Sequence, residues 1–335
     1  MNAAHTLSRR FPTVLIGTCC VGLAALLLTA AGAWADADES SPPPPLPDLA
    51  AQRIALERPL PQRDELRYAV YRLELTRPAD PAPDAAADRT VLERFASIPR
   101  AGVQRPVFAD ERTILLVVDA GRPVNPAGDM PRGHHREPGP RVPAEDEALA
   151  RSAAEALADQ PDAATSSDRA IVLSQAVARW WADDSEEGHP ALAAFTPWPQ
   201  PLGESAPAAW SLAAALRSQG IPARIMAGLV YPYESAEVEE AEQENAGAEP
   251  AFTFRMWVQA WVGGDEQPRE GQPPPIGARW VDLDATDPAD HTGRIALASG
   301  VLENEDLHPD ATALADLLER LRIEVISPRP FPVDR

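Results

Sequence analysis

Three segments with helical spacing precede three segments with strand character in the second half of the chain, and this order constrains the fold most strongly. Apolar side chains recur every three or four positions in the helical segments, whereas β-branched and aromatic residues dominate the strand segments. The helical segments are 148–157, 169–181 and 208–218, and the strand segments are 223–231, 252–262 and 278–283. Helices followed by consecutive strands indicate an α+β domain in which the helices pack on an antiparallel sheet.

Tryptophan is confined to this part of the chain once the first 35 residues are set aside. All seven remaining tryptophans lie between Trp180 and Trp280, which predicts that the main core is here because tryptophan buries a large apolar area. Two insertions separate the strands: Glu234–Pro250 is dominated by glutamate, and Gly263–Gly277 is rich in Pro and Gly. We expect both insertions to be exposed loops, since neither can bury enough apolar surface to order itself.

The N-terminus has the pattern of an export signal. Arg9 and Arg10 precede an uncharged, mostly apolar run from Val14 to Ala33, and Ala33-Trp34-Ala35 forms a small-residue cleavage site. The apolar run approaches the roughly 20 residues that span a bilayer, so an uncleaved anchor is the alternative. We therefore expect residues 1–35 to direct the protein to the periplasm or the exterior, with membrane contact only if the segment stays uncleaved.

The cysteine and histidine content limits the chemistry of the exported part. Cys19 and Cys20 both lie in the apolar run, so residues 36–335 contain no cysteine and can form no disulfide, zinc-thiolate site or cysteine nucleophile. His134 and His135 lie in a stretch rich in Pro, Gly and Arg, which predicts a solvated loop rather than a metal site. His189 and His308 have Pro or Gly neighbours and carry the same expectation. We expect no metal and no cofactor.

The charge balance is strongly acidic and excludes two classes of partner. Residues 36–335 hold 51 acidic residues against 28 basic ones, which are the 30 of the whole chain less Arg9 and Arg10, and every basic residue is arginine because the chain has no lysine. A net charge near −23 repels nucleic acid and anionic lipid, so we expect neither as a partner.

Composition divides the exported part into four regions. A proline cluster from Ser40 to Pro47 predicts an extended spacer, and two strands at 66–76 and 113–118 predict a small β-rich region. The regions are a spacer at 36–64, the β-rich region at 65–122, a linker at 123–146 and the main domain at 147–330.

Several sequence blocks, which occur in order, resemble those of one known superfamily. The blocks are L-R-S-Q-G-I-P-A-R from Leu216 to Arg224 with I-M-A-G-L-V-Y to Tyr231, F-T-F-R-M-W from Phe252 to Trp257, R-W-V-D-L-D-A-T from Arg279 to Thr286, I-A-L-A-S-G from Ile295, and L-R-I-E-V from Leu321. Together they resemble the transglutaminase-like superfamily over roughly residues 150–326. The resemblance implies a papain-like α+β domain, preceded by the β-rich N-terminal region.

The same resemblance identifies three positions where that superfamily has a catalytic cysteine, histidine and aspartate. The cysteine position, twelve residues before Arg217, is Ser205; the histidine position is Arg255; only the aspartate is retained, as Asp284. We expect Ser205 to lie at or beside the N-terminus of the helix that ends near Ser218. We also expect Arg255 and Asp284 to form a salt bridge in place of the catalytic histidine–aspartate pair.

These substitutions remove the chemistry of the superfamily. A serine hydroxyl needs a general base, and a guanidinium stays protonated and cannot act as one. His291 follows Asp284 in a Pro- and Gly-containing loop, which argues against its acting as a replacement base. The resemblance therefore implies a pseudoenzyme without transglutaminase, peptidase or amidase activity.

Three functional hypotheses follow from the sequence. The first is a non-catalytic exported module that binds a peptide or partner protein in the former substrate groove. The second is a hydrolase of peptide or amide bonds with altered chemistry that uses Ser205. The third is a stable envelope protein whose fold serves assembly alone.

Overall fold

The computed structural model describes residues 44–57, 60, 66–76, 85–98, 103–119, 129–183, 188–231, 250–263, 277–286 and 293–330. The chain divides into a unit at 1–45 and a unit at 46–335, and the second is described below. The proposed export signal, most of both insertions and His291 lie outside the described residues. In the part of the chain that the structure describes, no helix has the length and apolar character needed to cross a membrane.

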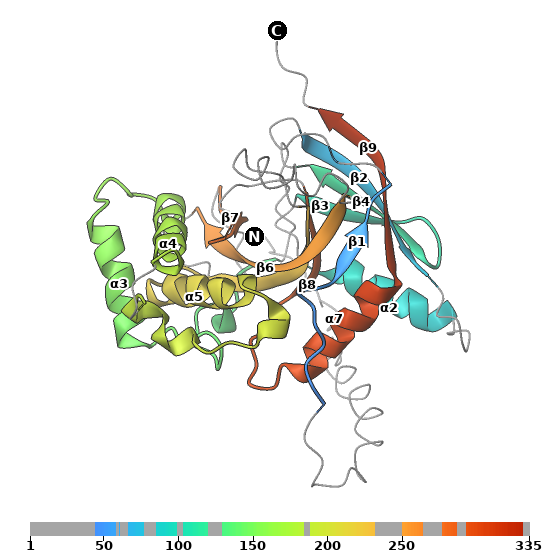
Figure 1. The fold of residues 1–335 in the computed structure, drawn as a ribbon. Coiled ribbons are helices and arrows are strands. Elements are labelled where there is room, and N and C mark those ends of the chain that lie inside the picture. The colour runs from blue at the N-terminus through green and yellow to red at the C-terminus, as the bar shows by residue number, and fades with distance from the viewer. Residues whose placement is uncertain are drawn as a thin grey trace, which may run out of the picture. The chain divides into compact units, whose positions relative to one another are not determined.

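A five-stranded antiparallel sheet forms the centre of the second unit (Figure 1). Its strands are β1 (Arg53–Ala55), β5 (Ala223–Val230), β6 (Ala251–Val262), β7 (Arg279–Leu283) and β8 (Arg294–Ser299). The order is β1-β6-β5-β8, and β7 also pairs with β6. Because β5 occupies one edge of β6 from Thr253 to Ala260, β1 and β7 share its other edge, where β1 pairs at 251–253 and β7 at 258–262.

Three helices pack together beside this sheet. They are α3 (Glu147–Ala158), α4 (Ser166–Trp181) and α5 (Ser205–Ser218). Helices α4 and α5 pack against β6, and α3 packs against the other two helices. Every residue of α5 from Ser205 to Arg217 is buried, because its alanine-rich surface allows α3, α4 and the sheet to approach closely. The three predicted helices and three predicted strands are all present. The helices begin one to three residues earlier than the apolar spacing indicated.

A second antiparallel sheet takes strands from both ends of the chain. Its order is β3-β4-β2-β9, formed by β2 (Leu66–Leu75), β3 (Gln104–Phe108), β4 (Thr113–Asp119) and β9 (Leu321–Pro330), with α2 (Ala85–Ser97) and α7 (His308–Arg320) as the adjoining helices. Buried Asp88 of α2 forms ion pairs with Arg112 and with Arg320 of α7. The β-rich region at 65–122 precedes the main domain in the chain, and β9 from the C-terminal end completes its sheet.

Two stretches that were predicted to be spacers are packed into the fold. In the spacer at 36–64, Leu49 is fully buried and β1 extends the central sheet. In the linker at 123–146, Asp129 forms an ion pair with buried Arg224, and Val142 is fully buried. Both predictions relied on proline content, whereas buried apolar side chains and a paired charge anchor the described parts of these stretches.

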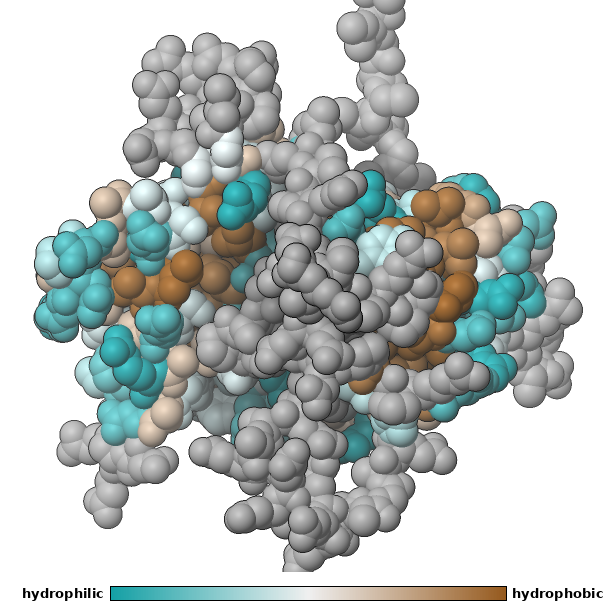
Figure 2. All heavy atoms as spheres, turned by 90° about the horizontal axis from the view of Figure 1, so that it is seen from above, coloured by the Kyte–Doolittle hydropathy of each residue, from teal (hydrophilic) through white to brown (hydrophobic). Residues whose placement is uncertain are grey.

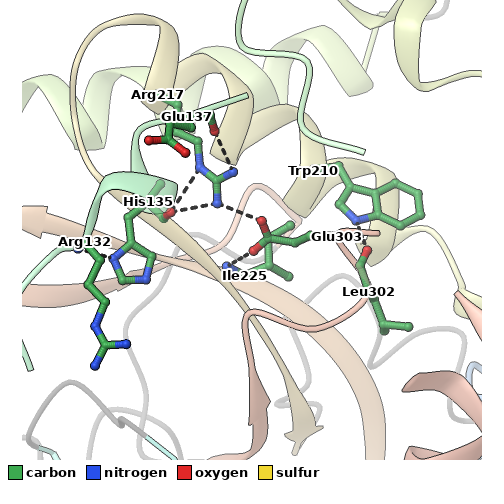
Figure 3. Close-up of polar contacts among 9 residues, drawn as sticks. Arg132, His135, Glu137, Trp210, Arg217, Ile225, Leu302 and Glu303 are labelled. Atoms are coloured by element: carbon green, nitrogen blue, oxygen red, sulfur yellow. Dashed lines mark hydrogen bonds and ion pairs between the residues drawn. The ribbon is translucent and has the colours of Figure 1, made fainter. Parts of the chain in front are cut away.

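The histidines of these regions also differ from expectation. His135 is buried in a short 3-10 helix (η2, Gly133–His135), its Nδ1 accepts a hydrogen bond from the Arg132 amide, and its ring packs edge-on against Trp280 (Figure 3). Burial, followed by the electrostatic effect of nearby cationic groups, lowers the pKa of His135 to about 3. His189 caps a 3-10 helix and stacks on Trp180, whereas His308 is the first residue of α7.

Hydrophobic side chains also reach the surface. Figure 2 shows hydrophobic residues at the surface of the face drawn there, with hydrophilic residues beside them. Among the described residues, Val107 on β3 and Ile326 on β9 are 51% and 48% exposed. They lie on the two outer strands of the second sheet, away from the strands that carry the positions inferred from the sequence.

Candidate functional site

Ser205 is the first residue of α5, as predicted. The chain reaches it through a 3-10 helix (η4, Gln200–Leu202) and Gly203, whose φ of +75° is a conformation that favours glycine. Ser205 is 8% exposed, and its Oγ accepts a hydrogen bond of 3.1 Å from the backbone N–H of Met256 in β6. The helix therefore fixes the serine hydroxyl against the central strand of the sheet.

The Ser205 hydroxyl occupies a gap along one edge of β6. The N–H of Phe254 donates to the carbonyl of Gln52 in the segment that includes β1, and the N–H of Met256 donates to Ser205. From Val258 onward the edge pairs with β7. Since alternate residues of a strand direct their N–H groups to the same side, Ser205 completes the edge between β1 and β7.

Asp284 lies directly after β7 and is 3% exposed. Its Oδ1 accepts hydrogen bonds from the Thr286 amide at 2.9 Å and from Thr286 Oγ1 at 2.7 Å. Its Oδ2 pairs with Nη2 of Arg294 at 3.2 Å, and both side chains are 2% exposed. Asp284 is therefore held in a buried ion pair with a residue of β8.

The predicted salt bridge between Arg255 and Asp284 is wrong. Arg255 is half-buried on β6, and its Nη1 donates to Thr286 Oγ1 at 3.4 Å, while no direct ion pair joins it to Asp284 in the described structure. Arg294 forms the ion pair with the Asp284 carboxylate instead. Thr286 links the two predicted residues, because its hydroxyl donates to Asp284 and accepts from Arg255.

The three positions inferred from the sequence nevertheless meet at one stretch of β6. Ser205 binds the amide of Met256, the neighbour of Arg255, and Arg255 connects through Thr286 to Asp284. A hydrolytic triad needs direct hydrogen bonds from nucleophile to base and from base to carboxylate. Here Ser205 bonds the backbone beside Arg255, and Arg255 reaches Asp284 only through Thr286, so the three positions lie near one another without the direct contacts of a triad.

A row of hydrogen bonds continues from this stretch along β6 and β7. Asp282 Oδ1 accepts from Trp257 Nε1 at 3.0 Å and from Gln259 Nε2 at 2.9 Å, and Gln259 Oε1 accepts from Arg224 Nε at 2.8 Å. The Arg224 guanidinium lies 4.0 Å from the centroid of the Trp280 ring. These contacts connect β5, β6 and β7, so the strand that carries Arg255 and the strand that leads to Asp284 are cross-linked by buried and partly buried polar groups.

Arg217, the other arginine of the L-R-S-Q-G-I-P-A-R block, lies at the opposite end of α5 from Ser205 (Figure 3). Arg217 donates to the carbonyls of Ala223 and Glu137, and its Nη2 pairs with Glu303 Oε2 at 2.9 Å. Glu303 Oε1 accepts from the amide of Ile225. Arg217 and its neighbours therefore connect α5, β5 and two distant loops, which is a structural role.

Sequence reasoning missed two residues of the site. Thr286 lay within one of the resembling blocks but received no role, and Arg294 was not singled out. The signal for Arg294 was available, since it is a charge directly before the apolar run I-A-L-A of one of the resembling blocks. A charge at the start of a buried strand needs a partner, and Asp284 is that partner.

Comparison with known proteins gives one domain assignment. Residues 152–285, which include Ser205, Arg255 and Asp284, match the family model of the transglutaminase-like superfamily. Among solved structures 25 chains match, including a candidate cysteine protease from Cytophaga hutchinsonii, with 12% identity, 77% of this chain and 85% of that chain covered, and a TM-score of 0.32. Red sea bream transglutaminase matches with 12% identity, 72% and 51% coverage, and a TM-score of 0.26. No curated protein sequence matches.

Proposed function

We propose that this chain, whose residues 152–285 are a transglutaminase-like domain, is a catalytically inactive exported module that binds a peptide or partner protein at the former substrate groove. We place that groove at the edge of β6 around Ser205, Arg255 and Asp284. The observation that carries the proposal is the buried ion pair between Asp284 and Arg294. The carboxylate that would orient and charge a histidine is already neutralised within the fold.

The chemistry of the other two positions supports inactivity. A hydroxyl becomes a nucleophile only when a neighbouring base accepts its proton, and loss of general base catalysis alone costs about 10²–10⁴ in rate. The base position holds Arg255, which remains protonated and donates to Thr286. Ser205 itself accepts a hydrogen bond from a backbone amide.

Export is the second part of the proposal. It rests on the signal pattern of residues 1–35. The net charge of −21 for the whole chain favours a neutral or basic partner over an acidic one, because the field of the protein attracts cations and repels anions.

A hydrolase that uses Ser205 is the second candidate. The observation that favours it is the position of Ser205 at the N-terminus of a 14-residue helix, where the helix dipole stabilises negative charge on the oxygen. This candidate requires a base that takes the place of Arg255.

Two assays on the full chain separate the candidates. A fluorophosphonate probe should leave the wild type unlabelled, and labelling that disappears in Ser205→Ala would support the hydrolase instead. Peptide binding is measured on an array of basic, neutral and acidic extended peptides. Arg255→Glu should abolish binding of the peptides that the wild type retains, while Arg72→Glu, an exposed change on the second sheet, should not. An array that binds nothing would contradict the binding role and leave assembly as the function.

A further inference from the structure

The N-terminal strap, which we define as residues 46–56, lies on the same edge of β6 as the candidate site. Arg53 pairs with Thr253 and Ala55 with Ala251 in the β1–β6 register. The carbonyl of Gln52 accepts the N–H of Phe254 at 3.4 Å, which is the last backbone bond on this edge before the one that Met256 makes to Ser205. The strap therefore ends its pairing next to the serine.

The strap also contacts the loop that leads into α5. The amide of Ala50 donates to the carbonyl of Pro201 at 2.9 Å. A Cβ added to Gly203 would lie 3.1 Å from the Cβ of Ala50, so glycine at this position permits the close approach as well as the φ of +75°. The strap is thus attached at two places near Ser205, namely β6 and the loop that contains Gly203.

The strap is held by buried side chains and by a limited number of backbone hydrogen bonds, among them the one from the Leu56 amide to the Pro250 carbonyl at 2.7 Å. Leu49, Ile54 and Leu56 are 0%, 8% and 5% exposed, and the Asp48 carboxylate accepts the amide of Ala51 in the turn before β1. The strand itself contains three residues. A short strand held by side-chain burial can release as a unit without unfolding the sheet behind it.

We infer that the N-terminal strap is an intramolecular gate over position 205, and that it must leave the edge of β6 before a ligand reaches that side chain. Ser205, which is 8% exposed, lies beside both attachments of the strap, the bond from Phe254 to Gln52 and the bond from Ala50 to Pro201. The inference concerns the site of the proposed function, but it holds whether that site is inactive or catalytic. An extended peptide that binds there takes the edge that the strap vacates.

The test measures access to position 205 by thiol alkylation. Ser205→Cys is made in the full chain with Cys19→Ser and Cys20→Ser, so that the introduced cysteine is the only thiol, and iodoacetamide alkylation is followed by mass spectrometry above the thiol pKa. Leu49→Ala together with Ile54→Ala weakens the strap and should raise the alkylation rate at least about tenfold, because local opening becomes more frequent.

Two controls separate gate opening from general loss of stability. Leu92→Ala removes a buried side chain of α2 that has no part in the strap, and it should leave the alkylation rate within about twofold of the parent. A synthetic peptide of residues 44–57, added to the weakened variant, should slow alkylation again by rebinding the vacated edge. Equal alkylation rates in the parent and the weakened variant would overturn the inference. Equal acceleration by Leu92→Ala would overturn it as well.

Discussion

Removing Asp284 should destabilise the protein strongly, because its partner is buried. Asp284 and Arg294 side chains are both 2% exposed, and Asp284 also accepts two hydrogen bonds from Thr286. Asp284→Ala leaves an uncompensated guanidinium in the core, which costs about 3–5 kcal/mol. Replacing both residues, with Asp284→Leu and Arg294→Met, removes the charge as well as its partner and should cost far less.

The assay is urea denaturation followed by tryptophan fluorescence and circular dichroism, with coincident transitions as the check on two-state unfolding. Glu324→Ala is a matched control, because its ion pair with Arg72 is about half exposed and should contribute about 0–1 kcal/mol. Arg294→Ala should be as costly as Asp284→Ala, whereas Arg255→Ala should lower stability by less than about 1 kcal/mol. A cost for Arg255→Ala equal to that of Arg294→Ala would refute the assignment of the buried pair.

Three further predictions concern other parts of the fold. Folding lowers the pKa of His135 from 6.5 to about 3 and so favours its neutral form. The free energy of unfolding is therefore unaffected by the titration of His135 above pH 6.5 and decreases as the pH falls from 6.5 toward 3. Denaturation at pH 7, 5.5 and 4 should show that the free energy of unfolding falls by about 1 kcal/mol per pH unit, and that it falls less steeply in His135→Phe. The same slope in that variant and in the wild type would contradict this prediction. Gly228→Ala should lower the free energy of unfolding by at least about 2–3 kcal/mol, because a Cβ there would lie 2.2 Å from the Ile295 carbonyl oxygen. Gly139→Ala should leave it almost unchanged, because a Cβ there would have nothing within 4 Å. Deleting residues 234–249 should change the melting temperature by only a few degrees, because closure entropy varies slowly with loop length and the adjoining strands pair up to Val230; a large decrease would show that the insertion packs.

The main domain could be predicted from sequence because its elements are long and regular. The helix at 205–218 shows continuous apolar spacing and a glycine stop, and the strands β5 and β6 carry eight and twelve residues of strand character. Other elements were missed, among them the helices α2 and α7 of 13 residues each. The three residues of β1 give no periodic signal, and β9 completes a sheet whose other strands lie more than 200 residues earlier in the chain. Long-range pairing of this kind is not encoded in a local pattern.

The candidate site was likewise predicted only in part. The resemblance identified Ser205, Arg255 and Asp284, and the structure brings them to one stretch of β6. The partner of Asp284 could not be assigned by analogy, because it depends on which cation the sheet places against the carboxylate. That cation is Arg294, ten residues later on β8, rather than the arginine at the histidine position.

The central claim is that a catalytic arrangement persists at these positions without its nucleophile and its base. The measurement that tests it most directly is the pH dependence of iodoacetamide alkylation at position 205, in full chains carrying Cys19→Ser and Cys20→Ser. Ser205→Cys with Arg255→His is compared with Ser205→Cys with Arg255→Ala, so that the imidazole is the only difference. We predict that the histidine variant shows a thiol pKa at least about one unit lower, because an imidazolium beside the helix N-terminus stabilises the thiolate. Identical profiles, both near the free thiol value of about 8.5, would show that position 255 does not face position 205 and would contradict the account.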